Sequence, residues 1–275
     1  MPLLDGVRRT RQVAGAFIRM GYLLEFSYPL AFVMTQAQAL LPVFIYFFVA
    51  RLVPHHGPSV GGDYFTFVVI GALSVRILGA GLNDLGTQVN DAIQQGQFEM
   101  LLVEPVRWRA LPLGMAQWPL VVRAVTSVIT LAITVFMGAH YRATGVPLAL
   151  VITLLGAFAS LAIGSLALSV KVLAKRSDPV LAVYSVIVQV LAGAYFPVKF
   201  LPLPLRVISY ALPHTYVIAA NRAVLMPHGS SLPGPSPATA VIGLVCFSVV
   251  GYAFALWLLG RTFDYARRIG VLGGY

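Results

Sequence analysis

Apolar residues fill this chain in long blocks that are separated by short polar segments. A helix needs about 20 residues to cross a hydrocarbon core roughly 30 Å thick, and six blocks have about this length. They cover residues 29–53, 63–82, 113–139, 146–170, 179–197 and 238–260. The pattern predicts an all-α, polytopic membrane protein with six transmembrane helices, in one domain that spans residues 1–275.

Residues 1–28 precede the first block and follow a different pattern. At 100° per residue, one side of a helix collects apolar and small residues, while the other side collects mainly arginines. The first side holds Val7, Ala14, Phe17, Ile18 and Gly21, and the second holds Arg8, Arg11, Gln12 and Arg19. This predicts an interfacial amphipathic helix whose arginines face anionic headgroups. The alternative is an ordinary basic cytoplasmic tail.

The proline-rich segment 198–237 joins the last two blocks and is neither clearly apolar nor clearly polar. It contains amphipathic fragments, such as the spacing of Leu205, Ile208 and Leu212. We expect short helices at the outer membrane surface, which dip in and out of the membrane.

Composition and charge agree with a membrane protein. Apolar residues make up 59% of the chain and charged residues only 10%, compared with about 25% charged in soluble domains. The net charge is +10, but the basic residues lie mostly between the blocks, so they indicate topology and no nucleic-acid partner. With the N-terminus inside, twelve of the 19 Lys and Arg fall in inner segments, five in outer segments and two, Arg76 and Arg123, in spans. Both termini are therefore expected in the cytoplasm, and the chain in the cytoplasmic (inner) membrane.

Several kinds of chemistry lack their residues in this sequence. There is no G-x-x-x-x-G-K-[ST] motif to hold nucleotide phosphates, and no histidine spacing that indicates a metal site. The single cysteine excludes an intrachain disulfide. Asp63 is the first residue of the second predicted span, and no Asp or Glu lies in the interior of any span, so a carboxylate proton relay is not expected. We predict no catalytic residue, no metal and no cofactor in this chain, and no coupling to an ion gradient alone.

A few polar residues within the predicted spans are candidates for a substrate path: Gln36, Gln38, Arg76 and Gln189. Buried amides in a membrane must find hydrogen-bond partners, so bonds to neighbouring helices explain the glutamines equally well. Arg76 lies in the middle of its span, where it costs about 3 kcal/mol on insertion scales, and should face protein or a wet cavity. Structural pairing of Arg76 remains an alternative.

Two further patterns within the spans indicate packing. Gly156, Ser160 and Gly164 form a small-xxx-small stripe in the fourth span, which favours close helix contact. At the outer end of the first span, Phe44, Tyr46 and Phe47 are typical of an aromatic belt at the membrane interface. The alternative is that they grip an apolar substrate.

The inner segment 83–112 joins the second and third spans and is the largest cytoplasmic piece. Gly96 interrupts the helix that leaves the second span, and Pro105 ends the short stretch that follows. Within it, Phe98, Leu101 and Leu102 are apolar and Glu99 is acidic. This predicts either a short amphipathic helix on which a cytosolic partner docks or simply a tight turn.

Two stretches resemble the ABC-2 type transporter permease family. The run Gly96-x-Phe98-Glu99-x-Leu101-Leu102-x-x-Pro105 is similar to the segment after that family's second span. The second stretch is similar to the region between the family's fifth and sixth spans, and its matching residues are Gly193, Phe196, Pro197, Pro202, Pro213 and Arg222. Together the two stretches extend the likeness over nearly the whole chain.

The resemblance implies a permease subunit of an exporter that moves a hydrophobic or amphipathic substrate by alternating access. It further implies a dimer with a second copy or a related permease, surrounded by membrane lipids. Two separate ATP-binding subunits would hold ATP and Mg, and would dock at Gly96–Pro105. One alternative is a polysaccharide or lipid-linked glycan exporter of the same superfamily. Another is a membrane-embedded enzyme, although the Ser/His, paired Asp or His-rich motifs of such enzymes are absent.

Overall fold

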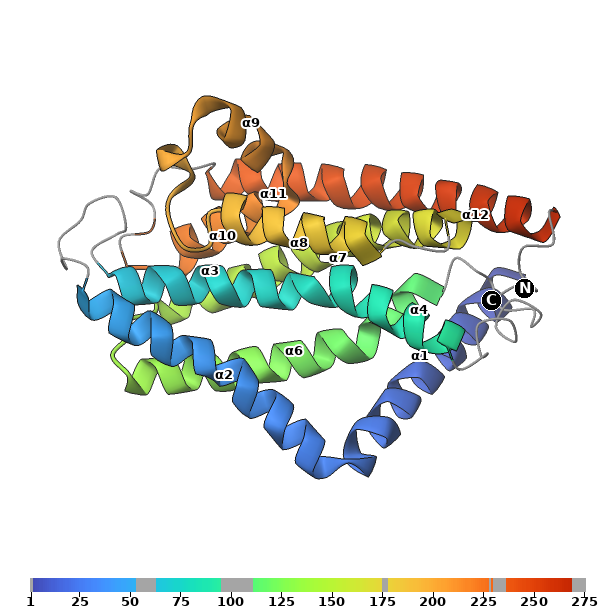
Figure 1. Cartoon of the computed structure of the whole chain (residues 1–275), viewed down its shortest axis with the longest axis horizontal. Coiled ribbons are helices and arrows are strands. Elements are labelled where there is room, and N and C mark those ends of the chain that lie inside the picture. The colour runs from blue at the N-terminus through green and yellow to red at the C-terminus, as the bar shows by residue number, and fades with distance from the viewer. Residues whose placement is uncertain are drawn as a thin grey trace.

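The computed structural model describes residues 2–52, 63–94, 111–174, 178–227, 229 and 236–268. Within these ranges the secondary structure is helical and contains no strand. The long helices run roughly side by side along the longest axis of the molecule (Figure 1). α1 begins and α12 ends at the same end of this bundle, which we call the terminal end; the opposite end is the far end.

Five helical segments are long and apolar enough to cross a membrane. They are Pro29–Leu52 (α2), Tyr64–Val89, Leu111–Phe136 (α6), Ala143–Lys171 and Pro237–Tyr265. The second comprises α3 (Tyr64–Gly79), a π-helical turn (Ala80–Asp84) and the start of α4 (Leu85–Gln94). The fourth comprises a 3₁₀ turn (Ala143–Gly145) and most of α7 (Val146–Ala174); the fifth comprises α11 (Pro237–Cys246), a π-helical turn (Phe247–Gly251) and most of α12 (Tyr252–Arg268). These segments confirm five of the predicted spans as membrane-length helices.

The remaining predicted span, 179–197, is only partly helical. α8 (Asp178–Leu191) has 14 residues and therefore a length of about 21 Å, which is shorter than a hydrocarbon core. Gly193 then adopts a left-handed conformation with φ +81°, which a glycine tolerates without steric cost. The helical prediction for residues 192–197 is wrong, and a count of six full spans is not reached in the described residues.

The chain after α8 folds back onto the bundle. A 3₁₀ turn (Val198–Phe200), α9 (Leu203–Ala211) and α10 (Pro213–Leu225) follow, as expected for short helices. α9 projects from one side of the bundle in Figure 1. α10 instead packs against α3, α7 and α11, and most of its residues are buried. α10 is therefore part of the bundle interior and not a surface helix.

The N-terminal helix α1 (Pro2–Ser27) is inclined to the long axis of the bundle, and it meets α2 at an elbow near Pro29 (Figure 1). Its apolar side packs on α6. A Cβ atom at Gly21 would lie 2.3 Å from the Trp118 ring, so only glycine permits this approach. The indole Nε1 of Trp118 donates a 2.9 Å hydrogen bond to Glu25. The helix itself is confirmed, and its position at a membrane interface stays a prediction.

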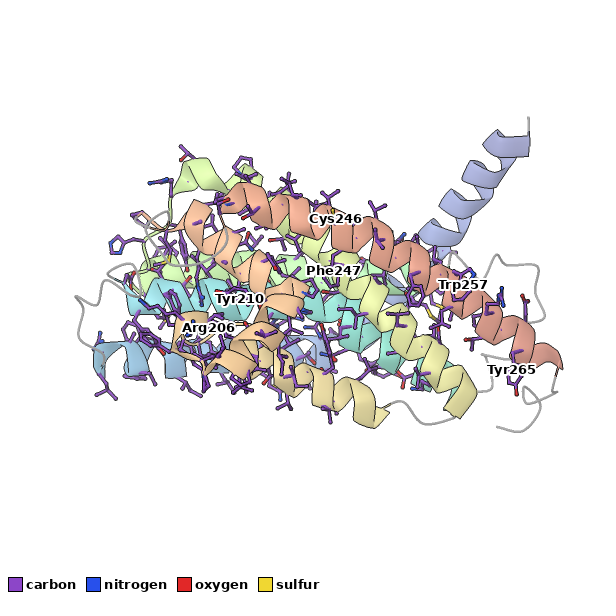
Figure 2. All side chains as sticks on the ribbon, turned by 90° about the horizontal axis from the view of Figure 1, so that it is seen from above. Arg206, Tyr210, Cys246, Phe247, Trp257 and Tyr265 are labelled. Carbon is purple, nitrogen blue, oxygen red and sulfur yellow. The ribbon has the colours of Figure 1, made fainter. Side chains whose placement is uncertain are left out.

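The best-buried helix is α3. In the most apolar stretch of its span, 78% of the residues are buried, compared with 6% for the span of α2 and 11% for the span of α11–α12. Cys246, Phe247, Trp257 and Tyr265 are exposed along α11–α12 (Figure 2). Large exposed apolar side chains on peripheral helices are what a bilayer solvent requires.

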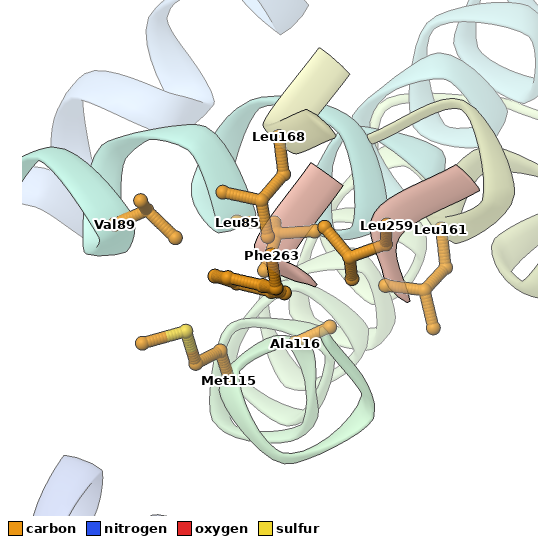
Figure 3. Close-up of a cluster of buried hydrophobic side chains, with 8 residues drawn as sticks. All are labelled: Leu85, Val89, Met115, Ala116, Leu161, Leu168, Leu259 and Phe263. Carbon is orange, nitrogen blue, oxygen red and sulfur yellow. The ribbon is translucent and has the colours of Figure 1, made fainter. Parts of the chain in front are cut away.

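The core near the terminal end is an apolar cluster contributed by α4, α6, α7 and α12 (Figure 3). Leu85, Leu259 and Phe263 are almost completely buried in it. Beside this cluster, α7 contacts the first π-helical turn at very short range, since a Cβ at Gly164 would lie 2.1 Å from the Gly81 carbonyl oxygen. The small-residue stripe therefore packs as the sequence indicates.

Candidate functional site

A cavity of about 260 Å³ lies between α2, α3, α6 and α8. It is half open, and its apolar wall includes Val43, Val69 and Leu73. Most of its polar side chains come from the middle of the bundle, namely Arg76, Asn83, Arg123, Thr130 and Gln189. The structure thus brings together two residues that the sequence marked as a candidate substrate path, Arg76 and Gln189.

The other two candidate path residues lie elsewhere. Gln36 is half-buried between α2 and α6, where its amide oxygen accepts a hydrogen bond from the Thr126 hydroxyl. Gln38 is exposed on the surface of α2. Neither residue lines the cavity, so any role of theirs in a substrate path stays a prediction.

An ion pair forms one side of the cavity. Arg123 Nε and Nη2 each lie 2.6 Å from a carboxylate oxygen of Asp84, so the pair is bidentate. Arg123 Nη1 also donates a 2.7 Å hydrogen bond to the Arg76 carbonyl oxygen. The expectation that the interior of the spans contains no carboxylate is wrong for Asp84. The second span continues through the π-helical turn to Val89 and so includes Asp84, whose charge Arg123 balances.

Arg76 extends from α3 toward α2. Its Nη1 donates a 2.8 Å hydrogen bond to the Ala39 carbonyl oxygen. Within the described part of the chain, no carboxylate forms an ion pair with Arg76. The Asn83 amide oxygen, about two turns further along, accepts a 2.7 Å hydrogen bond from the Ser185 hydroxyl of α8. The cavity is therefore polar and carries a positive charge on Arg76.

Two tyrosines line the cavity toward its far end. The Tyr46 and Tyr195 hydroxyl oxygens are 3.5 Å apart, and Tyr64 donates a 3.2 Å hydrogen bond to the Tyr195 carbonyl oxygen. From the sequence, Tyr46 has two interpretations, contact with an apolar substrate or a place in an aromatic belt, and Tyr195 has no predicted role. Nothing in the local pattern distinguishes a cavity tyrosine from a belt tyrosine, because both lie near the end of an apolar block.

The family-like residues of the second stretch build the turn after α8, with Arg222 at its centre. The Arg222 side chain is 5% exposed and donates to three carbonyl oxygens: Phe67 at 3.0 Å, Gly193 at 2.7 Å and Ala194 at 2.6 Å. Its guanidinium also lies 3.4 Å from the Phe67 ring centroid. Arg222 therefore connects the turn to α3 through hydrogen bonds, next to the cavity.

The remaining residues of that stretch have local structural places. Phe196 packs partly buried against an apolar cluster of α8 and α10, and Pro197 is buried just before the 3₁₀ turn. Pro202 is exposed in front of α9, and Pro213 is the buried first residue of α10. Proline is favoured at a helix start because its missing N–H would have no partner there.

The candidate coupling residues Gly96, Phe98, Glu99, Leu101, Leu102 and Pro105 lie outside the described residues, which end at Gln94 and resume at Leu111. In the described residues, α4 ends at Gln94, shortly before this segment, and α6 begins at Leu111, after it. Docking at these residues stays a prediction.

Comparison with known families gives one match. A family model described as ABC-2 type transporter matches residues 25–226 of the chain. The matched range begins at the elbow between α1 and α2 and extends past α10, so it includes the cavity and the turn that Arg222 holds. Comparison with curated proteins gives no match.

Proposed function

The chain belongs to the ABC-2 type transporter family, and on that premise we propose that it exports a hydrophobic or amphipathic substrate across the cytoplasmic membrane. As a member it is a multi-pass membrane protein and a permease subunit, which works with ATP-binding subunits. We further propose two such subunits, which hold ATP and Mg, and a second permease copy or relative in a dimer.

The observation that carries the proposal is the half-open polar cavity in the middle of a bundle of membrane-length helices. Ionisable side chains at membrane depth are costly, and they mark substrate and ion pathways. In alternating access, the dimer would open this cavity first to the cytoplasm and then to the outside. Both termini would face the cytoplasm, which agrees with α1 beginning and α12 ending at one end of the bundle (Figure 1).

Energy would arrive through residues 96–105. Phe98, Leu101 and Leu102 would provide apolar contact area in a groove of the ATP-binding subunit, and Glu99 would fix the register. Truncation of a desolvated, paired charge costs about 2–5 kcal/mol, which weakens binding about thirtyfold or more. A charge exposed at a helix end contributes only about 0.3–1 kcal/mol.

The test is copurification of the permease with its co-encoded ATP-binding subunits, followed by measurement of ATP hydrolysis in nanodiscs. Glu99→Ala and Phe98→Ala are each expected to reduce copurification or to abolish coupling of hydrolysis to substrate. Asp91→Ala is the matched control, because Asp91 is an exposed acid on α4 just ahead of the segment. Full partner binding and normal substrate-stimulated hydrolysis in both variants would show that this segment is not the docking site.

A further inference from the structure

Among the described residues, the charge on Arg76 is the one at the cavity that no ion pair balances. A guanidinium has five N–H donors, and the hydrogen bond to the Ala39 carbonyl oxygen uses one of them. The residue lies near the middle of the span Tyr64–Val89. An ionisable group at that depth is costly and indicates a functional site with a partner of opposite charge.

The neighbouring arginine does not share this imbalance. Arg123 is held by both carboxylate oxygens of Asp84 at 2.6 Å, so this pair contributes no net charge. The two arginines and the one aspartate at the cavity therefore sum to a single positive charge, which belongs to Arg76.

In the five described spans, a second copy of this chain offers no unpaired carboxylate at the depth of Arg76. The sequence contains nine acidic residues. Asp84 is the one that lies well inside a span, and Arg123 already binds it. The other eight lie at the ends of the five spans or outside them: Asp5, Glu25, Asp63, Asp91, Glu99, Glu104, Asp178 and Asp264. A homodimer would thus not neutralise Arg76 with a carboxylate of its own.

The size of the cavity indicates how much of a ligand enters it. Its volume of about 260 Å³ is below the roughly 300–1,000 Å³ of pockets that enclose a whole drug-sized molecule. Since the cavity is half open, a ligand can leave part of itself outside. Gln189 and Asn83 supply further polar groups, while Val43, Val69 and Leu73 supply an apolar wall. These surroundings suit a charged group that is attached to an apolar body.

We propose that the substrate is an anionic amphiphile, whose carboxylate or phosphate binds Arg76 while its apolar part extends from the cavity. The inference rests on the proposed function as an exporter. Arginine suits the role because its planar fork binds such anions in a bidentate manner. A resident membrane lipid would keep its headgroup at the interface, about 15 Å from the membrane centre, so an anion at mid-span belongs to a molecule in transit.

The test compares two probes that differ only in charge: dodecanoate with a fluorophore on its last carbon, and the methyl ester of the same molecule. The permease is placed in phosphatidylcholine nanodiscs, and binding is measured by fluorescence anisotropy. We expect wild-type protein to bind the acid at least tenfold more tightly than the ester. Arg76→Gln should remove this preference and Arg76→Lys should retain part of it. Arg51→Gln is the control, because Arg51 is exposed at the far end, and it should behave as wild type.

Several outcomes would overturn the proposal. Equal affinity of wild-type protein for acid and ester does so without any variant, and it remains decisive even if Arg76→Gln fails to fold. An acid preference that survives in folded Arg76→Gln would place the anion elsewhere. Displacement of the acid by millimolar inorganic phosphate would indicate a site for small free anions and not for amphiphiles.

The same preparation separates this inference from the proposed function. ATP-dependent export of both probes without an acid preference would leave the exporter intact and overturn the anionic substrate class. A clear acid preference that depends on Arg76, in a chain that neither copurifies with ATP-binding subunits nor responds to ATP, would support the anion site and overturn the exporter.

Discussion

Replacement of Arg222 by methionine isolates the interaction that holds the turn after α8. Methionine keeps most of the length and the apolar stem of arginine, but it has no N–H donor. In wild-type protein the buried guanidinium donates to the carbonyl oxygens of Phe67, Gly193 and Ala194. Arg222→Met leaves the Gly193 and Ala194 carbonyl oxygens of the turn without their donor. The Phe67 carbonyl loses only its side-chain bond, because it lies within α3 and also accepts a bond from the helix backbone.

The expected loss of stability follows from the number of abandoned acceptors. An unpaired buried polar group costs about 1–3 kcal/mol, so the two turn carbonyls together cost on the order of 2 kcal/mol or more if they do not find water. Removal of a buried cation offsets part of this, since its desolvation was itself unfavourable. We expect a net destabilisation of about 2 kcal/mol. Arg222→Lys should lose less, because it keeps the charge and one or two of the bonds.

The measurement is the free energy of unfolding from SDS titration in mixed micelles. Arg142→Met serves as the control, because Arg142 is exposed and donates through its side chain to one carbonyl oxygen, that of Pro227 at 2.9 Å. Surface substitutions of this kind usually change stability by no more than about 0.5 kcal/mol. If Arg222→Met proves as stable as Arg142→Met, the guanidinium does not hold the turn and the reasoning fails.

Two further predictions concern packing and orientation. Gly164→Ala should destabilise by about 2 kcal/mol in the same titration, because an added Cβ meets a backbone oxygen at 2.1 Å; Gly243→Ala, whose nearest neighbours are 3.8 Å away, should not, and equal effects would contradict the close contact. In a cysteine-free background, Gly57→Cys and Ser230→Cys should react with a membrane-impermeant thiol reagent on intact cells. Reaction at Arg268→Cys instead would reverse the proposed topology.

The long helices were predictable because the bilayer sets the length of a span, so a block of about 20 apolar residues directly predicts a transmembrane helix. The extension of the second span was not. Asn83 and Asp84 reduce the local hydropathy, so the block ends at residue 82 by sequence, while the helix continues to Gln94. Asp84 is tolerated there because Arg123, from a different helix, binds it with two hydrogen bonds. A pairing between residues 39 positions apart leaves no periodic signal.

The turn after α8 was missed for a related reason. Residues 192–197 are apolar enough to continue a span, and sequence pattern alone does not distinguish a buried turn from a buried helix. Two features make this stretch a turn: the left-handed conformation of Gly193, and the hydrogen bonds that Arg222 donates to the Gly193 and Ala194 carbonyl oxygens. Both residues belong to the stretch that resembles the family, but the pattern does not indicate that Arg222 donates a hydrogen bond to the Gly193 carbonyl oxygen.

The sequence predicted part of the candidate site, because it identifies polar side chains within apolar blocks. Arg76 and Gln189 are conspicuous because a polar side chain in an apolar block needs an explanation. Gln36 and Gln38 meet the same criterion, but one bonds to a neighbouring helix and the other is exposed. Which polar residues share a cavity depends on how four helices pack, and that information is distributed over the whole bundle.

One continuous run of helix, from Tyr64 to Gln94, connects these features. It carries the carbonyl oxygen of Phe67 that Arg222 binds, the unbalanced Arg76 of the cavity, and Asp84 in the π-helical turn. Its last part, α4, leads into the proposed docking segment. A force applied to residues 96–105 would therefore act on the helix that lines the cavity, without an intervening loop in the described residues. Single π-turns within α-helices are frequent at functional sites, and this one lies between the docking segment and Arg76, where a change in helix packing would alter the cavity.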